Sequence, residues 1–155
     1  MDTQECTEEY IQFKADGLLL EGYLHYPVEG TPTKSILLLN PHPQFGGNMD
    51  NNVIRHLARR FAEHGTVSLR FNYHGVGKSE IIFPEGQSAF EYFGDMEAKQ
   101  NYELLIPDAL AAYSFLQQAC SCETTPDITG YSFGAILAAM ISEDCKPNSI
   151  VAISP

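Results

Sequence analysis

Basic side chains are scarce in this sequence, and the scarcity excludes several classes of partner. The 155 residues hold nine Lys and Arg against 20 Asp and Glu, which gives a formal net charge of −11. A phosphate backbone or an anionic lipid surface would be repelled by this charge, so we expect neither nucleic acid nor a membrane as a partner. Small neutral or cationic molecules remain compatible with it.

Long apolar runs are also missing. No stretch approaches the roughly 18 apolar residues of a membrane span. The first ten residues, MDTQECTEEY, carry acids where a secretory signal has basic residues and an apolar core. We therefore predict a cytoplasmic protein.

Cysteines are few and scattered, at positions 6, 120, 122 and 145. In a chain of ordinary domain size this spacing is not that of a disulfide framework, so we expect reduced thiols. Cys120 and Cys122 have half the spacing of a zinc site, but no second pair follows. We therefore predict no metal.

The apolar pattern alternates between strand and helix periods along the chain. Short apolar runs, typical of strands buried in a parallel sheet, alternate with stretches of helical spacing. The expected elements are a hairpin of residues 10–15 and 18–26, strands at 35–40, 66–73, 127–130 and 149–154, and helices at 51–64, 107–119 and 132–141. This order predicts an α/β fold in one domain, residues 1–155, with a mostly parallel sheet and helices on both faces.

The most informative motif is Gly130-Tyr131-Ser132-Phe133-Gly134, between a short strand and a helix of small residues. In that context Gly-x-Ser-x-Gly is typical of a nucleophile elbow, in which small neighbours permit the sharp turn that exposes the serine hydroxyl. The Phe133 N–H, at the helix N-terminus, would point to where an oxyanion forms. The alternative is a serine that caps an ordinary buried helix.

Two further segments carry, together with the elbow, a resemblance to the alpha/beta-hydrolase superfamily. Residues 40–53, NPHPQFGGNMDNNV, resemble the His-Pro-His-Pro/Gly-Gly loop of small bacterial serine hydrolases akin to dienelactone hydrolases and serine peptidase-like acylhydrolases. Asn40 replaces the first His of that loop. Residues 70–79, RFNYHGVGKS, are similar to the Arg-Phe-Asn-x-Arg-Gly-x-Gly-x-Ser segment after the fourth strand. The resemblance runs from about Glu8 onward and implies an alpha/beta-hydrolase sheet.

The resemblance also implies roles for individual residues. Ser132 matches the nucleophile that attacks an ester, thioester or small amide through an acyl-serine intermediate, and Phe133 matches one oxyanion donor. The loop after the third strand supplies the other donor. Because Pro43 has no N–H, we expect that donor to be Gln44, with Phe45 as the next candidate. No metal or organic cofactor is implied.

After Ser132 the sequence has no histidine. In the resembling family the triad runs in the order Ser, acid, His, whereas here only the acids Glu143 and Asp144 follow, at the end of the nucleophile helix. The last two strand-helix units of that fold are not found in these residues. We therefore predict a C-terminally truncated hydrolase that is nearly inactive as this chain. The alternative is a non-catalytic half-domain that pairs with another chain, or with a copy of itself, through the C-terminal strand.

Two upstream histidines are expected near the serine. His42 follows the third strand and His74 the fourth, and the carboxyl ends of parallel strands open on one face. Either is a candidate substitute base; the alternatives are a loop-fixing role for His42 and a position normally held by Arg for His74. The aromatic-rich segment 80–103 leaves the same face and is predicted to be either a substrate flap or a helix packed on the core.

Overall fold

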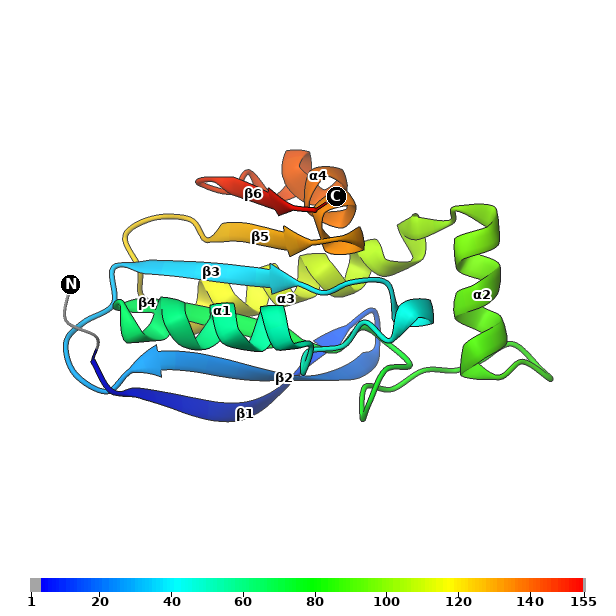
Figure 1. Ribbon diagram of the computed structural model, residues 1–155, viewed down its shortest axis with the longest axis horizontal. Coiled ribbons are helices and arrows are strands. Elements are labelled where there is room, and N and C mark those ends of the chain that lie inside the picture. Colours follow the sequence, from blue (N-terminus) through cyan, green and yellow to red (C-terminus); the bar gives the residue numbers. More distant parts are fainter. Residues whose placement is uncertain (1–3, 155) are drawn as a thin grey trace.

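Six strands form one mixed sheet, with helices on both of its faces, in the computed structural model, which describes residues 4–154 (Figure 1). The strands are β1 (Cys6–Ala15), β2 (Leu18–Pro27), β3 (Lys34–Leu39), β4 (Thr66–Phe71), β5 (Asp127–Tyr131) and β6 (Ile150–Ile153). The α-helices are α1 (Asn52–Glu63), α2 (Ala89–Lys99), α3 (Ile106–Ala119) and α4 (Phe133–Cys145), and the 3₁₀ turns are η1 (Pro43–Phe45) and η2 (Tyr102–Leu105).

The strand order across the sheet is β1-β2-β4-β3-β5-β6. β1 pairs with β2 and β2 with β4 in antiparallel fashion, and the remaining pairs are parallel. β3 and β4 are almost entirely buried because helices cover them on both sides. The predicted α/β fold, with an N-terminal hairpin followed by parallel strands, is confirmed.

The two faces of the sheet are covered by different helices. α1 packs on one face, where Ile54 and Ala58 meet Ile36 and Leu38 of β3. Its N-cap is Asn51, whose side chain accepts hydrogen bonds from the first-turn amides of the helix. α3 and α4 pack on the opposite face and, with the sheet, form the larger apolar core. Because β3, β4, β5 and β6 are parallel, they all end at one edge of the sheet, beside residues 40–47 and the N-terminus of α4.

The segment 80–103 contains α2, which stands beyond the edge toward which β3 and β5 point (Figure 1). It begins with a capping box, in which Ser88 and Glu91 bond each other's backbone amides. Phe93 and Met96 are its buried residues and join the larger core. The helix alternative for this segment is thus confirmed for Phe93, whereas Phe90 is exposed. The substrate flap stays a prediction.

Two cysteines differ from expectation. Cys120 and Cys122 form a disulfide, with their α-carbons 5.2 Å apart, so the prediction of reduced thiols is wrong for this pair. The chain leaves α3 in extended backbone at Cys120, and side chains two positions apart in extended backbone project to the same side. Cys6 and Cys145 are free thiols. Residues 4–154 contain no cluster of His, Cys, Asp and Glu arranged to hold a metal ion, and none of their helices has the length and hydropathy to cross a bilayer.

Candidate functional site

Ser132 occupies a strained turn between β5 and α4. Its backbone has φ 54° and ψ −123°, a region that non-glycine residues rarely adopt and that costs about 1–3 kcal/mol. The Ser132 N–H donates to the Ile153 carbonyl at 2.8 Å, and its carbonyl accepts from the Ala135 N–H at 2.9 Å. Its side chain makes no capping hydrogen bond to α4. The alternative of an ordinary helix cap is therefore not supported.

The two glycines of the motif are required by close backbone packing. A β-carbon on Gly130 would overlap the Gly134 carbonyl, and a β-carbon on Gly134 would overlap the Leu39 carbonyl at the end of β3. The turn therefore brings the first residues of α4 into direct contact with both β5 and β3. This packing holds Ser132 at the carboxyl edge of the sheet, where it is half-buried.

The loop after β3 curls back on itself around His42. The Gln44 N–H donates to His42 Nδ1 at 3.1 Å, and the Phe45 N–H donates to the His42 carbonyl at 3.0 Å. Both loop amides predicted as the second oxyanion donor, those of Gln44 and Phe45, are therefore bonded within the loop in this structure. Either amide would have to exchange its partner in order to reach an oxyanion.

His42 lies against the elbow. Its ring centroid is 4.8 Å from that of Phe133, the residue after Ser132, and its Nε2 lies 3.5 Å from a Glu97 carboxylate oxygen on α2. Burial lowers the pKa of His42 below its ordinary 6.5, and Glu97 acts in the opposite direction. The loop-fixing role predicted for His42 agrees with these contacts.

His74 faces α2 and α3 instead of the serine. The Asp108 carboxylate accepts from both the His74 backbone N–H, at 2.7 Å, and the Nδ1 of the ring, at 2.8 Å. Nε2 lies 2.9 Å from the Tyr92 hydroxyl. Because β3 separates β4 from β5, the ends of those strands are roughly 10 Å apart. His74 is thus not placed to accept a proton from Ser132 here, and the substitute-base hypothesis is not supported for it.

Sequence reasoning missed Asp108 and Tyr92 as partners of His74. The sequence places Asp108 in the first turn of the predicted helix 107–119, where the helix dipole favours an acid, and the structure buries it. A signal was present, because Asp108 is four residues before Ala112 and eight before Leu116, in the same apolar stripe of α3. An acid in such a stripe needs a buried partner. Tyr92 had no comparable signal.

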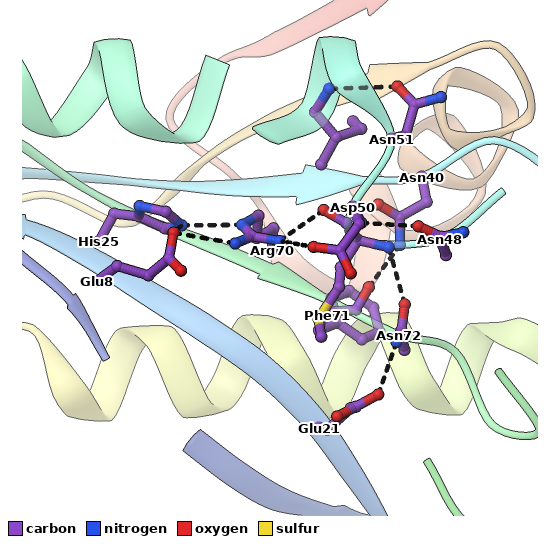
Figure 2. A network of polar contacts seen from close by, with 12 residues as sticks. Glu8, Glu21, His25, Asn40, Asn48, Asp50, Asn51, Arg70, Phe71 and Asn72 are labelled. Atoms are coloured by element: carbon purple, nitrogen blue, oxygen red, sulfur yellow. Dashed lines mark hydrogen bonds and ion pairs between the residues drawn. The ribbon is translucent and has the colours of Figure 1, made fainter. Parts of the chain in front are cut away.

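A buried arginine joins several segments of the chain (Figure 2). Arg70 of β4 is 1% exposed. Its Nε donates to His25 Nε2 at 2.9 Å, and its terminal nitrogens donate to Glu8 at 3.0 Å and to Asp50 and the Met49 carbonyl at 2.8 Å. One side chain thus joins β1, β2 and the loop before α1.

Asn72 continues the same network (Figure 2). Its Oδ1 accepts from the Met49 N–H at 2.8 Å, and its Nδ2 donates to the buried carboxylate of Glu21 at 2.8 Å. Asn40, which stands where the resembling loop has its first His, donates to the Phe71 carbonyl. One end of the loop 40–50 is therefore fixed to β4 through Asn40. The other end is fixed through Met49 to Asn72, the residue that follows β4.

His25 makes the stability of the fold depend on pH. Burial, with the Arg70 charge acting in the same direction, lowers its pKa from 6.5 to about 4. The unfolded chain then binds the extra proton between these values, so stability is full above about pH 6.5 and falls by up to about 3 kcal/mol toward pH 4. Urea unfolding at pH 7 and pH 5 should show a steeper loss for the native chain than for His25→Gln. The exposed His56→Gln variant should keep the native slope, and an equal slope in His25→Gln would refute the assignment.

Comparisons with known proteins agree with this geometry. No family model matches the chain. An alpha-beta serine hydrolase homologue from Coxiella burnetii superposes with a TM-score of 0.74 at 25% identity, over 95% of this chain and 62% of that one. A protein of unknown function from Agrobacterium tumefaciens, put forward as an alpha/beta hydrolase, superposes with a TM-score of 0.72 at 25% identity, over 93% of this chain and 59% of that one.

The chain has the alpha/beta-hydrolase fold. An uncharacterized protein of Rickettsia prowazekii, RP471, is 32% identical over 120 residues, which are 77% of this chain and 44% of that protein. The chain thus spans less than two thirds of the length of these relatives. Within the hydrolase fold described by residues 4–154, Ser132, Phe133 and His42 come together at the carboxyl edge of the sheet, whereas His74 belongs to a separate buried cluster. Glu143 and Asp144 are exposed in the last turn of α4.

Proposed function

We propose that this chain carries the nucleophile and oxyanion elements of a serine acyl hydrolase of the alpha/beta-hydrolase fold. Ser132 would attack the carbonyl carbon of an ester, thioester or small amide and form an acyl-serine that water then hydrolyses. Phe133, with Gln44 or Phe45, would donate hydrogen bonds to the oxyanion. The small bacterial subgroup with a His-Pro-His-Pro loop, related to dienelactone hydrolases and esterases, is the branch that residues 40–53 fit best.

The observation that carries this proposal is the backbone of Ser132. A serine with positive φ that caps nothing, at the tip of a strand, has no evident structural reason to be strained. Strain of this kind gathers where a side chain must be presented in a fixed direction. The burial of two glycines against neighbouring carbonyls shows how much packing holds the turn in place.

The acid and base of the reaction are a further part of the proposal. No carboxylate or imidazole among residues 4–154 is recorded in contact with the Ser132 hydroxyl. We propose that other residues of the native protein supply both, because the relatives are longer and because the family's order places the acid and the histidine after the serine. This chain alone should then be nearly inactive. The intact mass of the protein from its native source tests this, since a mass near 17.2 kDa would refute it.

Labelling with an alkyl fluorophosphonate tests the nucleophile directly. We expect the protein from its native source to be labelled at Ser132, and the 155-residue chain to react at least about 100-fold more slowly because its serine has no base. Peptide mapping by mass spectrometry identifies the labelled residue. Ser142→Ala is the matched control and should label normally, whereas Ser132→Ala should not label. Label on another residue, or none in the native protein, would contradict the proposal.

The strained serine also predicts a trade between stability and function. Ser132→Gly should stabilise the chain by about 1 kcal/mol, because glycine adopts positive φ without the steric cost. Ser132→Ala keeps the β-carbon and should leave the free energy of unfolding nearly unchanged. Urea titration of both variants gives the comparison, and a destabilised Ser132→Gly would argue against strain at this position.

A second candidate function is favoured by the edge of the sheet. β6 pairs with β5 on one side only, and its Ile150 and Val151 are 40% and 49% exposed. Such an edge can add a strand from another chain. A non-catalytic half-domain would therefore associate through β6 without labelling at Ser132. Sedimentation velocity of the native chain and of Val151→Lys distinguishes the two functions. An associating half-domain would sediment as an oligomer that Val151→Lys converts to the monomer, whereas the sedimenting mass of a chain that does not associate through β6 would be the same in both.

A further inference from the structure

We propose that His42 is a positioning residue that couples α2 to the loop after β3, so that its protonation decides whether the Gln44 amide is bonded within the loop or released. The inference deepens the proposed function, because Gln44 is the leading candidate for the second oxyanion donor. Three contacts of the buried His42 ring, each made to a different part of the site, support this role.

The first contact fixes the tautomer. His42 Nδ1 accepts the Gln44 N–H at 3.1 Å, so the neutral ring must carry its proton on Nε2. A side chain that accepts from the amide two residues later is also the pattern of an Asx turn, which Asn and Asp make with their own oxygen. His42 therefore performs a turn-forming role that a side chain without a pKa near neutrality could perform as well.

The second contact joins His42 to α2. Nε2 is buried and has no hydrogen-bond partner in the structure of residues 4–154, and its nearest recorded acid is Glu97 at 3.5 Å. The same Glu97 oxygen accepts the Tyr102 hydroxyl of η2 at 3.1 Å. Gln44 also reaches α2, where its side-chain amide lies beside Gly94. The ring thus lies between the loop and the helix, with its Nε2 donor 3.5 Å from a carboxylate oxygen to which it makes no hydrogen bond.

The third contact places the ring beside the serine. Its faces and edges meet the rings of Phe45, Tyr102 and Phe133, and Phe133 directly follows Ser132. Among the described residues that contact His42, Glu97 is the acid and Tyr102 is the other titratable residue. Burial raises the pKa of the Tyr102 hydroxyl, and its bond to Glu97 acts in the same direction, so it stays neutral where imidazole titrates. Glu97 is therefore the group that responds to a charge on His42.

Protonation of His42 changes both sides at once. The added proton goes to Nδ1, which then has no lone pair for the Gln44 N–H, so that amide is released. The cation attracts Glu97 and holds α2 more firmly against the loop. Neutral His42 therefore commits the Gln44 amide to the loop, and cationic His42 frees it.

Nuclear magnetic resonance of the 155-residue chain tests the coupling without any need for catalysis. We expect the Gln44 amide proton and the His42 ring nitrogens to titrate with one shared midpoint below pH 6.5. Glu97→Gln should lower that midpoint, because Glu97 favours the cation, whereas Glu103→Gln, which removes an exposed acid on η2, should leave it unchanged. A Gln44 amide that does not move as His42 titrates, or a midpoint indifferent to Glu97, would overturn the inference.

Two variants at residue 42 connect the coupling to the serine. His42→Asn keeps an acceptor for the Gln44 amide but cannot titrate, and His42→Leu removes the acceptor. In the protein from its native source, the fluorophosphonate labelling rate of the wild type divided by that of His42→Asn should be one at high pH. At low pH this ratio should approach the labelling rate of His42→Leu divided by that of His42→Asn, because the Gln44 amide is then released in the wild type as well. A ratio that is constant across pH would overturn the link between His42 and Ser132. If Ser132 is labelled neither in the wild type nor in the variants, the proposed function is refuted, and the resonance experiment still decides whether His42 controls the Gln44 amide.

Discussion

Gly134→Ala is expected to destabilise the chain by about 3 kcal/mol or more and to abolish labelling of Ser132. The added methyl group would overlap the Leu39 carbonyl, a backbone atom at the buried end of β3, and it would also crowd the Asn40 carbonyl. The Leu39 carbonyl cannot move without disturbing the pairing of Leu39 with Gly130 of β5, and the Asn40 carbonyl cannot move without disturbing its hydrogen bond from the Tyr73 hydroxyl. Urea unfolding, with thermal melting as a second measure, gives the change in stability.

Gly94→Ala is the matched control for that experiment. Gly94 lies in the interior of α2, and the atoms nearest to a β-carbon there belong to the Gln44 side chain, at an ordinary contact distance of 3.5 Å or more. Alanine is the better helix former, so this variant should be stabilised by up to about 1 kcal/mol. Equal effects of the two substitutions would mean that the close approach of α4 to β3 does not control stability.

The elbow and the sheet could be predicted from sequence because their determinants are local. Each determinant lies within a short stretch of sequence: the apolar runs of β3 and β4, the Gly-x-Ser-x-Gly spacing and the small residues of α4. In a chain whose strands and helices alternate, each of these patterns predicts one kind of element. The strain at Ser132 also follows from its place in that motif. Local pattern was therefore enough to place Ser132, Phe133 and the loop at one edge.

The polar clusters could not be predicted because their partners are distant in sequence. Arg70 meets Glu8 across 62 residues, and His74 meets Asp108 across 34. Periodicity marks Arg70 and Asp108 as charges on buried faces, but it does not say which of several acids or histidines neutralises them. The same limit applies to His42, whose Nδ1 partner is two residues away while Glu97, opposite Nε2, lies on another helix.

Arg70→Met is expected to cost about 2–4 kcal/mol, because it removes a buried donor from three side chains and a carbonyl at once. The flexible thioether fills much of the space, so the loss should come chiefly from hydrogen bonds and not from a cavity. Arg60→Met is the control. Arg60 makes an ion pair with Glu63 on the surface of α1 and is 46% exposed, so its removal should cost less than about 1 kcal/mol.

The same substitution gives a second, independent readout through His25. The Arg70 charge is one of the causes that lower the pKa of His25 to about 4, so in Arg70→Met that pKa should rise toward its ordinary value. The gap between the folded and unfolded pKa then narrows, and the loss of stability between pH 6.5 and pH 4 becomes shallower. A pH dependence in Arg70→Met as steep as that of the native chain would mean that burial alone, without the guanidinium, keeps His25 neutral.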